Sequence, residues 1–380
     1  MTLPETMRGV YLTRHGGPEA LQWRADIPVP RPGPGEVLVR VRAAGVNNTD
    51  INTREGWYAA AVAGATGETA DGVESGGWAG ALAFPRIQGG DLCGVVVARG
   101  TQVETPALGA RVTCPINIPR PAEENPVGFI ALGSEIDGAF AEYCLMAAAD
   151  LYDVSDVPLS DIEIAALPCG FGTALGLLER AGVGPGQEVL ITGASGNVGL
   201  AAVQLAAALG ARVTGIAAAA KAAVLREEGA AEVIARDAPL PQDRYDAVID
   251  LVGGAGVAAL IDALRPGGHF AVAGAIAGPM ITVDLRRIYL RDITLHGCTY
   301  QAPQVFARLI EMARAGRVRP RIAAAYPLRD IARAQADFHR NHAARWLYRA
   351  GIGETLGRPG DAALVDAGDD RPSRDRPVGA

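Results

Sequence analysis

The pattern of apolar and polar positions changes near residue 160. Before it, short apolar or alternating runs, such as residues 37–42, 94–98 and 110–114, are separated by turns rich in glycine and proline. This pattern is typical of an all-β, barrel-like domain. After residue 161, predicted helices alternate with predicted strands, which favours a parallel, doubly wound sheet. The sequence therefore predicts two domains of different class.

The α/β part alternates strand and helix patterns over most of its length. Apolar runs predict strands at residues 187–192, 211–216, 232–234, 247–251, 269–273 and 293–295. Helical periodicity predicts helices at residues 162–180, 198–209, 221–228, 256–264 and 305–315. Residues 321–348 indicate a return to the first domain. We therefore assign residues 1–160 and 300–353 to the first domain and residues 161–299 to the second.

Two segments do not have the pattern of a packed element. Residues 59–83 are mostly glycine, alanine and small polar residues, with Trp57 and Trp78 near the two ends. This segment is too long for an ordinary connection, so we expect a disordered or a mobile functional loop. A loop that covers the active-site cleft would make the pocket specific for a bulky substrate. Residues 354–380 have few apolar residues and are predicted to form a disordered tail.

Composition and charge argue against several classes of protein. The 380 residues carry a net charge of -7 without a dense basic cluster, so we expect no nucleic-acid partner. No apolar stretch is long and uninterrupted enough to cross a membrane. Residues 1–11 contain Pro4, Glu5 and Arg8 where a signal peptide needs an apolar core, so we expect a cytoplasmic protein. The five cysteines lie far apart and are odd in number, which predicts reduced thiols.

A glycine-rich turn joins the predicted strand at 187–192 to the predicted helix at 198–209. Its residues are Gly193, Ala194, Ser195, Gly196, Asn197, Val198 and Gly199. Gly193 and Gly196 allow the backbone to approach a pyrophosphate closely, and Gly199 allows the helix to pack on the sheet. The positive end of the helix dipole favours the anion. The strand, turn and helix together predict a dinucleotide-binding site.

The end of the next predicted strand indicates which dinucleotide is bound. A site for NAD would place an acidic residue there to hold the ribose hydroxyls. Residues 215–221 contain no acid and end with Lys221, the only lysine of the chain. An ammonium group pairs with a 2′-phosphate, which a carboxylate would repel, so we prefer NADP(H). The alternative is a solvent-facing lysine at a helix start, and Arg226 and Arg212 are weaker candidates for the same phosphate.

Several motifs occur in order along the chain: GVNNTD at 45–50, IQGGDLCG at 87–94, DGAFAEY at 137–143, ALP at 166–168, GASGNVG at 193–199 and LRPGG at 264–268. Together they resemble those of the medium-chain dehydrogenase/reductase superfamily, and within it the zinc-free branch of quinone oxidoreductases and enoyl reductases. The similarity spans roughly residues 8–350. It implies a GroES-like catalytic domain, a Rossmann domain that binds NADP, an active site in the cleft between them, and a homodimer paired through the edges of the Rossmann sheets.

Zinc-dependent members of this superfamily bind their metal at positions that carry other residues here. These residues are Asn47, Gly90, Asp91 and Cys169, of which Cys169 alone matches a ligand. One thiolate and one carboxylate do not make the three-ligand site of a catalytic zinc ion. The four-cysteine structural lobe is missing too. We therefore predict no metal site and expect Cys169 to be a small buried residue beside the nicotinamide.

Without a Lewis acid, an activated alkene is a better hydride acceptor than a plain ketone, because the alkene holds the resulting charge as an enolate. The reaction then needs a proton donor. Residues 47–58 are similar in spacing to enoyl-thioester reductases of this branch, which implies Tyr58 as the catalytic proton donor and a role for Asn47 in orienting the carbonyl or the nicotinamide ribose. The alternative for Tyr58 is a wall residue of an apolar pocket. For Asp50 we favour a structural role in the turn.

The resemblance also implies cofactor contacts after the last strands of the sheet. Gly274, Ala275 and Thr299 are expected near the carboxamide, Tyr300 near the substrate, and Arg345 takes the place of a lysine common in the family. The sequence thus predicts an NADPH-dependent reductase of a C=C bond conjugated to a carbonyl, acting on a small molecule. An NADPH:quinone oxidoreductase and an NADPH-binding protein with little turnover are the alternatives. A zinc alcohol dehydrogenase would require stoichiometric metal.

Overall fold

A computed structural model gives the fold over residues 3–59, 62, 64–65, 76–78, 80, 82–340 and 345–349. Residues 339–340 and 345–349 are described by their backbone alone. Most of the loop predicted at residues 59–83 lies outside the described residues, and so does the tail predicted at residues 354–380. The predictions for these two segments therefore stay predictions.

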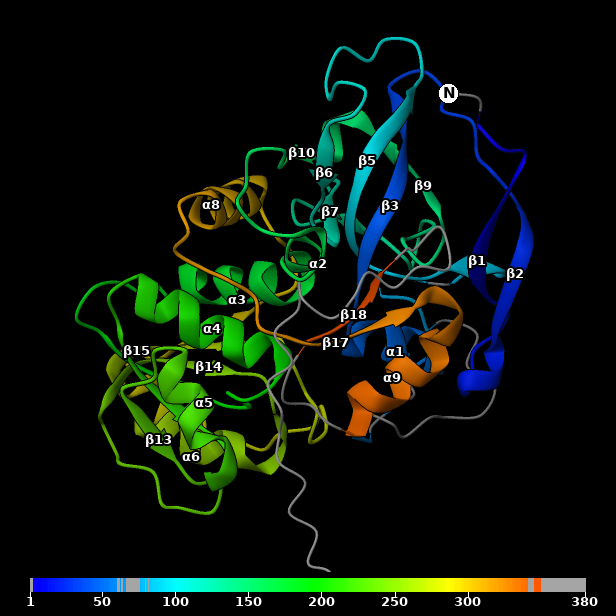
Figure 1. The fold of residues 1–380 in the computed structure, drawn as a ribbon. Coiled ribbons are helices and arrows are strands. Elements are labelled where there is room, and N and C mark those ends of the chain that lie inside the picture. The colour runs from blue at the N-terminus through cyan, green and yellow to red at the C-terminus, as the bar shows by residue number, and fades with distance from the viewer. Residues whose placement is uncertain are drawn as a thin grey trace, which may run out of the picture. The chain divides into compact units, whose positions relative to one another are not determined.

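The first domain is built on β-strands (Figure 1). The strands of its largest sheet are β3 (Glu36–Val46), β5 (Asp91–Arg99), β6 (Arg111–Thr113), β9 (Tyr143–Ala147), β10 (Tyr152–Asp153), β17 (Ile322–Pro327) and β18 (Arg345–Arg349). They follow the order β10-β6-β5-β3-β18-β17, and β9 also pairs with β3. Smaller sheets contain β1 (Thr6–Leu12), β2 (Leu21–Pro28) and β4 (Arg86–Ile87), and β7 (Asn117–Pro119) and β8 (Phe129–Ala131). Buried valines along β3 favour this long central strand.

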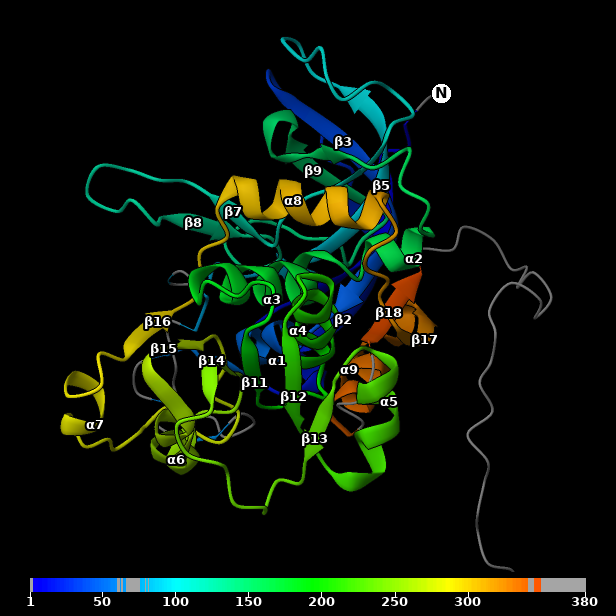
Figure 2. The same cartoon turned by 90° about the vertical axis from the view of Figure 1, so that its left-hand side faces the viewer.

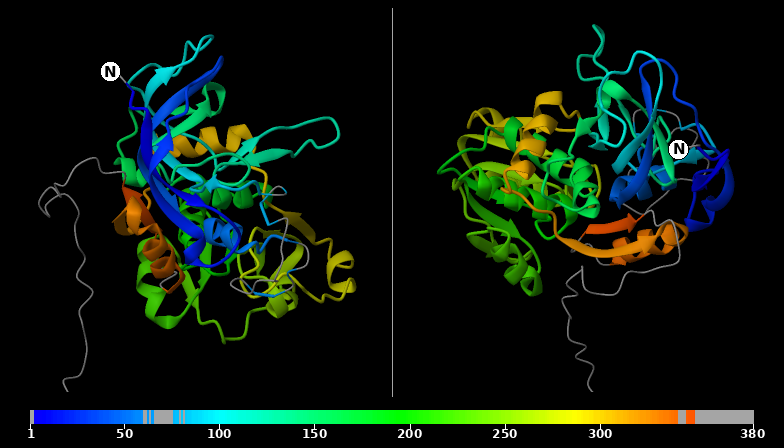
Figure 3. Two further views of the ribbon diagram at one scale, coloured as in Figure 1. Left: turned by 90° about the vertical axis from the view of Figure 1, so that its right-hand side faces the viewer. Right: turned by 45° about the horizontal axis from the view of Figure 1, so that its top comes forward.

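The C-terminal segment returns to this sheet, as the pattern at residues 321–348 predicts. Strand β18 pairs with β3 in antiparallel orientation, and β17 pairs with β18. Between β17 and β18, helix α9 (Ile331–Arg340) buries Ile331, Ala334 and Phe338 in the core of the first domain. Figure 3 shows this orange segment beside the blue N-terminal strands.

The second domain contains a six-stranded parallel sheet. Its strands are β11 (Glu188–Ile191), β12 (Arg212–Ile216), β13 (Glu232–Ile234), β14 (Tyr245–Asp250), β15 (Leu264–Val272) and β16 (Thr294–Gly297). They lie in the order β13-β12-β11-β14-β15-β16, with all neighbouring strands parallel (Figure 2). This order confirms the predicted doubly wound fold. Its strand order reverses between β11 and β14, which is where such sheets bind ligands.

Helices cover both faces of the parallel sheet. They are α3 (Pro168–Arg180), α4 (Asn197–Ala208), α5 (Ala222–Glu227), α6 (Val257–Ala263), α7 (Arg286–Tyr289) and α8 (Pro303–Arg314). Helix α2 (Asp161–Ile164) instead contacts β3, β5 and β18 of the first domain. Apolar residues of α3, α4, α5 and α8 share one core, whereas those of α6 belong to another. Helix α8 packs on α3, although we assigned its residues to the first domain. The domain limits themselves stay a prediction.

The prediction of one continuous helix at residues 162–180 is wrong. The structure has two helices there, α2 and α3, and Pro168 is the first residue of α3. Proline lacks the backbone N–H and clashes with the preceding turn, so it is accepted at a helix start but interrupts a helix interior.

Two further predictions concern the cysteines and the membrane. The five cysteines are all buried and form no disulfide, as predicted. Within the described part of the chain, no helix is long and apolar enough to cross a bilayer.

Candidate active site

The glycine-rich turn between β11 and α4 requires glycine where its backbone has a positive φ or lies close to other backbone atoms. Gly193 has a φ of +55°, in the left-handed region. A Cβ atom at Gly199 would lie 2.2 Å from the carbonyl oxygen of Gly193, so only glycine lets α4 begin this close to the strand. Gly196 is the N-cap of α4 and offers no capping side chain. This cradle fits a dinucleotide phosphate at the start of α4.

Lys221 lies just beyond the carboxyl end of β12. It ends a short 3-10 helix (Ala219–Lys221) and is the N-cap of α5. No carboxylate among the described residues forms an ion pair with it. Arg226 is exposed in the last turn of α5. Arg212 is unsuitable for the same phosphate, because it begins β12 at the opposite end and its guanidinium pairs with Glu188 at 3.1 Å.

Asn47 joins the first domain to the glycine-rich turn. It is the N-cap of α1 (Asn48–Glu55), and its Oδ1 accepts a hydrogen bond from Asn197 Nδ2 at 2.9 Å. Its own Nδ2 donates to Asp91 Oδ2 at 3.0 Å. The other oxygen of Asp91 accepts from the backbone N–H of Cys169, in the first turn of α3, at 2.7 Å. Four residues from distant parts of the chain therefore form one hydrogen-bonded chain.

Asp50 is a buried carboxyl group beside this chain. Its Oδ2 accepts a hydrogen bond from the backbone N–H of Asn47 at 2.8 Å, which gives it the structural role expected in this turn. Burial raises the pKa of Asp50 to about 7; the Asn47 N–H opposes this shift, and the negative charge of Asp91 adds to it. The carboxyl is therefore partly protonated at neutral pH.

Tyr58 follows α1 by way of Gly56, which ends that helix in the left-handed conformation. Its ring stacks on Trp78 with a centroid distance of 6.0 Å and meets Trp57 edge to face at 5.5 Å. Burial raises the pKa of Tyr58 to about 12, although hydrogen bonds with Thr49 and Asn52 act in the opposite direction. The phenol therefore keeps its proton throughout the neutral range.

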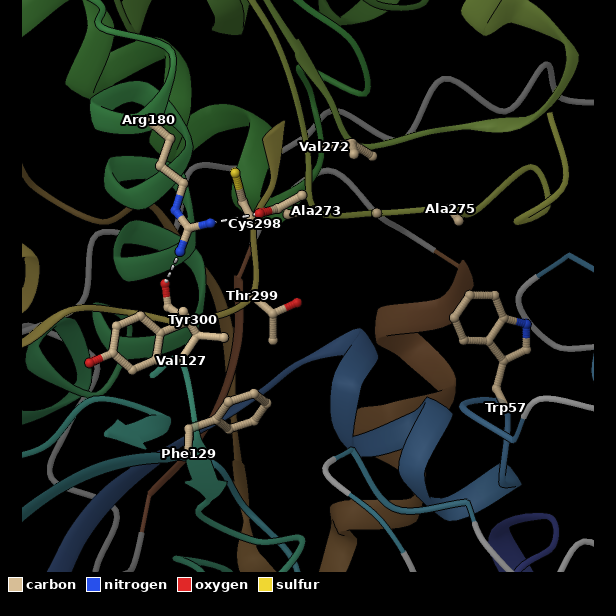
Figure 4. Close-up of a pocket in the computed structure, with 12 residues that line it drawn as sticks. Trp57, Val127, Phe129, Arg180, Val272, Ala273, Ala275, Cys298, Thr299 and Tyr300 are labelled. Carbon is tan, nitrogen blue, oxygen red and sulfur yellow. Dashed lines mark hydrogen bonds between the residues drawn. The ribbon is translucent and has the colours of Figure 1, made fainter. Parts of the chain in front are cut away.

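A cavity of 420 Å³ lies beside this aromatic cluster (Figure 4). It is lined by Trp57, Val127, Phe129, Arg180, Val272, Ala273, Gly274, Ala275, Gly297, Cys298, Thr299 and Tyr300. Three predicted cofactor residues, Gly274, Ala275 and Thr299, are among them, and so is Tyr300. A Cβ atom at Gly274 would lie 2.6 Å from the carbonyl oxygen of Leu251. The volume of the cavity is in the range of small-molecule binding sites.

Some predicted residues lie outside this cavity. Asn47, Tyr58 and Lys221 are not part of its lining, although Trp57 connects Tyr58 to it. For Arg345 only the backbone is described, at the start of β18 opposite Ile322. The cofactor contact of Arg345 therefore stays a prediction.

Several lining residues were not predicted from the sequence. Val127 and Phe129 belong to the hairpin of β7 and β8, which two apolar runs around a polar, proline-containing stretch would have predicted. Asn117 of β7 donates from Nδ2 to the carbonyl oxygen of Thr299 at 2.7 Å and so joins the two domains at the cavity. Arg180 ends α3, and no local signal in the sequence marks it as a lining residue.

Comparison with known proteins agrees with this architecture. The alcohol dehydrogenase GroES-like domain family matches residues 33–156, and the zinc-binding dehydrogenase family matches residues 197–315. A crystallised Sinorhizobium meliloti protein assigned as an alcohol dehydrogenase is 38% identical, with a TM-score of 0.81 over 91% of this chain and 97% of that protein. The chain belongs to the medium-chain dehydrogenase/reductase superfamily.

Two characterised types of oxidoreductase in this superfamily are similar to the chain. The quinone oxidoreductase of Lama guanicoe is 28% identical over 87% of this chain and 93% of its own length. The acryloyl-coenzyme A reductase of Metallosphaera sedula is 27% identical over 80% of this chain and 89% of its own length. The chain is therefore an oxidoreductase of the quinone oxidoreductase-like branch, whose members bind nicotinamide cofactors.

The match to a zinc-binding family raises the question whether zinc fits this medium-chain dehydrogenase/reductase. Among the described residues, no three His, Cys, Asp or Glu side chains lie close enough together to hold a metal ion. At the ligand positions, both oxygens of Asp91 accept N–H hydrogen bonds, and Asn47 offers an amide. These residues do not fit a catalytic zinc ion, which needs three protein ligands.

Proposed function

We propose that the chain is a zinc-independent, NADPH-dependent reductase of C=C bonds conjugated to a carbonyl. The observation that carries the proposal is the chain of hydrogen bonds through Asn47, Asp91 and Cys169, which occupies the metal-ligand positions with groups that do not fit zinc. A conjugated alkene needs no metal to accept hydride, because its charge spreads to the enolate oxygen. The similarity to an acryloyl-coenzyme A reductase supports the same chemistry.

The cofactor would bind across the carboxyl ends of the parallel strands. Residues 193–199 would hold the pyrophosphate, and Lys221 would pair with the 2′-phosphate of NADPH. Gly274, Ala275 and Thr299 would contact the carboxamide end, and we propose a further contact with Arg345. When bound, the nicotinamide supplies the hydride.

Tyr58 would donate the proton that completes the reduction, either directly or through a water. Its raised pKa of about 12 keeps the phenol protonated, and an enolate is basic enough to take that proton. Asn47 has one N–H left after its bond to Asp91, and this donor would orient the substrate carbonyl or the ribose. The apolar walls of the cavity would exclude water around the acceptor.

A homodimer paired through β16 is part of the proposal. Strand β16 ends the six-stranded sheet among the described strands, so one of its edges is unpaired. Large apolar side chains near this edge are exposed, including Met280, Leu285 and Leu290 at about 70% each. Pairing with a second copy of the chain would cover the unpaired edge of β16 and these exposed apolar side chains. The cytoplasmic location stays a prediction from the sequence.

A two-electron quinone reductase is the second candidate, favoured by the similarity to quinone oxidoreductases. It would use the same hydride geometry but depend less on a placed proton donor. The two candidates differ in how much activity they lose when Tyr58 is changed.

The proposal is tested by NADPH and NADH oxidation with purified protein of measured metal content. The acceptors are an enone, a 2-enoyl thioester, a quinone and a saturated ketone. We expect turnover of the enone or thioester with NADPH in metal-free protein, and a loss of about 10²- to 10⁴-fold in Tyr58→Phe. A rate of quinone reduction that is the same in wild type and Tyr58→Phe supports the second candidate. Cofactor binding without turnover indicates a binding protein, and zinc-dependent ketone turnover refutes the proposal.

A further inference from the structure

Arg180 places a guanidinium group in the wall of the cavity. It is the last residue of α3 and is half-buried. Its Nη1 donates to the carbonyl oxygen of Gly297 at 2.7 Å, and its Nη2 donates to that of Tyr300 at 3.3 Å (Figure 4). These two bonds fix the plane of the guanidinium relative to the cavity, and they leave N–H groups over, since a guanidinium has five.

The charge of Arg180 is not neutralised by its described surroundings. The adjacent carboxylate, Glu179, is engaged by Arg308 at 2.8 Å on the outer side of α3. No described carboxylate forms an ion pair with Arg180. The thiol of Cys298 is its other polar neighbour, and burial keeps the pKa of that thiol raised, so it brings no negative charge at neutral pH. The cavity therefore has one uncompensated positive charge at this wall.

Among the lining residues that the structure describes, Arg180 is the only cationic side chain. His296 of β16 lies nearby and shares a hydrogen bond of 2.9 Å with His269. Burial, His269 and Arg180 all lower the pKa of His296, so this imidazole is neutral at pH 7. The rest of the described lining is mainly apolar or aromatic, with Trp57, Val127, Phe129 and the ring of Tyr300, and Thr299 adds a hydroxyl group.

We infer that the cavity selects acceptors that have an apolar body and a carboxylate group, and that Arg180 binds this carboxylate. A carboxylate matches the planar fork of a guanidinium and gains strength where water is excluded. The apolar walls would hold the body of the acceptor. This inference rests on the proposed function and adds the substrate class: unsaturated carbonyl compounds that are also carboxylic acids.

Matched acceptors test this inference. The pair is 4-phenylbut-3-en-2-one bearing a para-carboxylate and the same enone bearing a para-carboxamide, which differ in charge but hardly in size. We expect wild-type kcat/KM to favour the carboxylate by about 10- to 100-fold. Arg180→Gln should lower kcat/KM for the carboxylate by about 10- to 100-fold more than for the carboxamide and so abolish this preference, whereas Arg180→Lys should keep part of it because the charge remains. Arg265→Gln is the control for loss of an exposed arginine elsewhere, and it should keep the full preference.

Two results would overturn the inference. One is a wild-type protein that reduces both acceptors equally well. The other is an Arg180→Gln variant that loses both activities to the same degree, because Arg180 would then only hold residues 297–300 in place.

A binding measurement separates this inference from the proposed function. Calorimetry with the saturated carboxylate, 4-(3-oxobutyl)benzoate, requires no turnover. Binding that is lost in Arg180→Gln, in a protein that reduces neither enone, supports the carboxylate site and refutes the reductase. Binding that is the same in wild type and Arg180→Gln refutes the carboxylate site alone.

Discussion

Asn197 in the glycine-rich turn donates a side-chain hydrogen bond of 2.9 Å to Asn47 at the start of α1. The two residues are 150 positions apart and belong to different domains. From Asn47 the connection continues through Asp91 to the first turn of α3. The expected phosphate site is thus joined directly to the positions at which zinc-dependent relatives hold their metal.

Asn47→Ala would break this connection at its centre. The change removes the Asn47 donor from one oxygen of the buried Asp91 and the Asn47 acceptor from Asn197. We expect the free energy of unfolding to fall by about 1–3 kcal/mol in urea titrations, because buried polar groups lose partners. We also expect KM for NADPH to rise, since Asn197 lies in the turn that would bind the phosphate.

Asn48→Ala is the matched control for this variant. Asn48 is the next residue, is only half-buried and lies outside the hydrogen-bonded chain. An equal loss of stability in both variants would mean that the Asn47 connection contributes nothing specific.

Gly199→Ala tests the close contact between α4 and β11. The added methyl would lie 2.2 Å from the carbonyl oxygen of Gly193, and this backbone atom can move only with the turn itself. We expect a loss of about 1–3 kcal/mol in the free energy of unfolding and a loss of cofactor binding by fluorescence titration. Gly176→Ala in α3 meets no atom within 4 Å and should instead be neutral or stabilising by up to about 1 kcal/mol. Similar losses in both would show that the contact at Gly199 is unimportant.

Lys221→Ala tests the preference for NADPH. Loss of a charged hydrogen bond to the 2′-phosphate should raise KM for NADPH by about 10- to 100-fold and leave KM for NADH unchanged. Initial rates with each cofactor measure this directly. Arg212→Ala should change neither value, because Arg212 lies at the other end of β12 and pairs with Glu188. Equal effects on both cofactors would contradict the assignment of Lys221.

The buried carboxyl of Asp50 should make stability depend on pH. Its pKa is raised from 3.8 to about 7, so between these values the folded state keeps a proton that the unfolded state releases. The free energy of unfolding should therefore fall as pH rises from about 4 to about 7, and the Asp50 contribution should be constant above that. As pH rises from 4.5 to 7.5, the free energy of unfolding of Asp50→Asn should increase relative to that of wild type by roughly 2–4 kcal/mol. Parallel pH profiles of wild type and variant in urea unfolding would contradict this.

Local patterns predicted the fold well, because its signals are local. The strand, glycine turn and helix at residues 187–209 follow from neighbouring residues. The position of Lys221 just after β12 follows in the same way, and its proposed role in binding the cofactor stays a prediction. The connection from Asn47 to Asp91 and Cys169 joins residues 44 and 78 positions apart and needs the packed structure. The place of Arg180 at the cavity depends on its bond to Gly297, which is 117 positions later and ends the edge strand β16.

The proposed reduction of the C=C bond is tested most directly by locating the transferred hydride in the product. The metal-free protein is given an enone and NADPH deuterated at the transferred position of nicotinamide C4, and the product is analysed by NMR. Conjugate reduction predicts a saturated ketone with deuterium on the β-carbon and a solvent proton on the α-carbon. An allylic alcohol with deuterium on the former carbonyl carbon would contradict it.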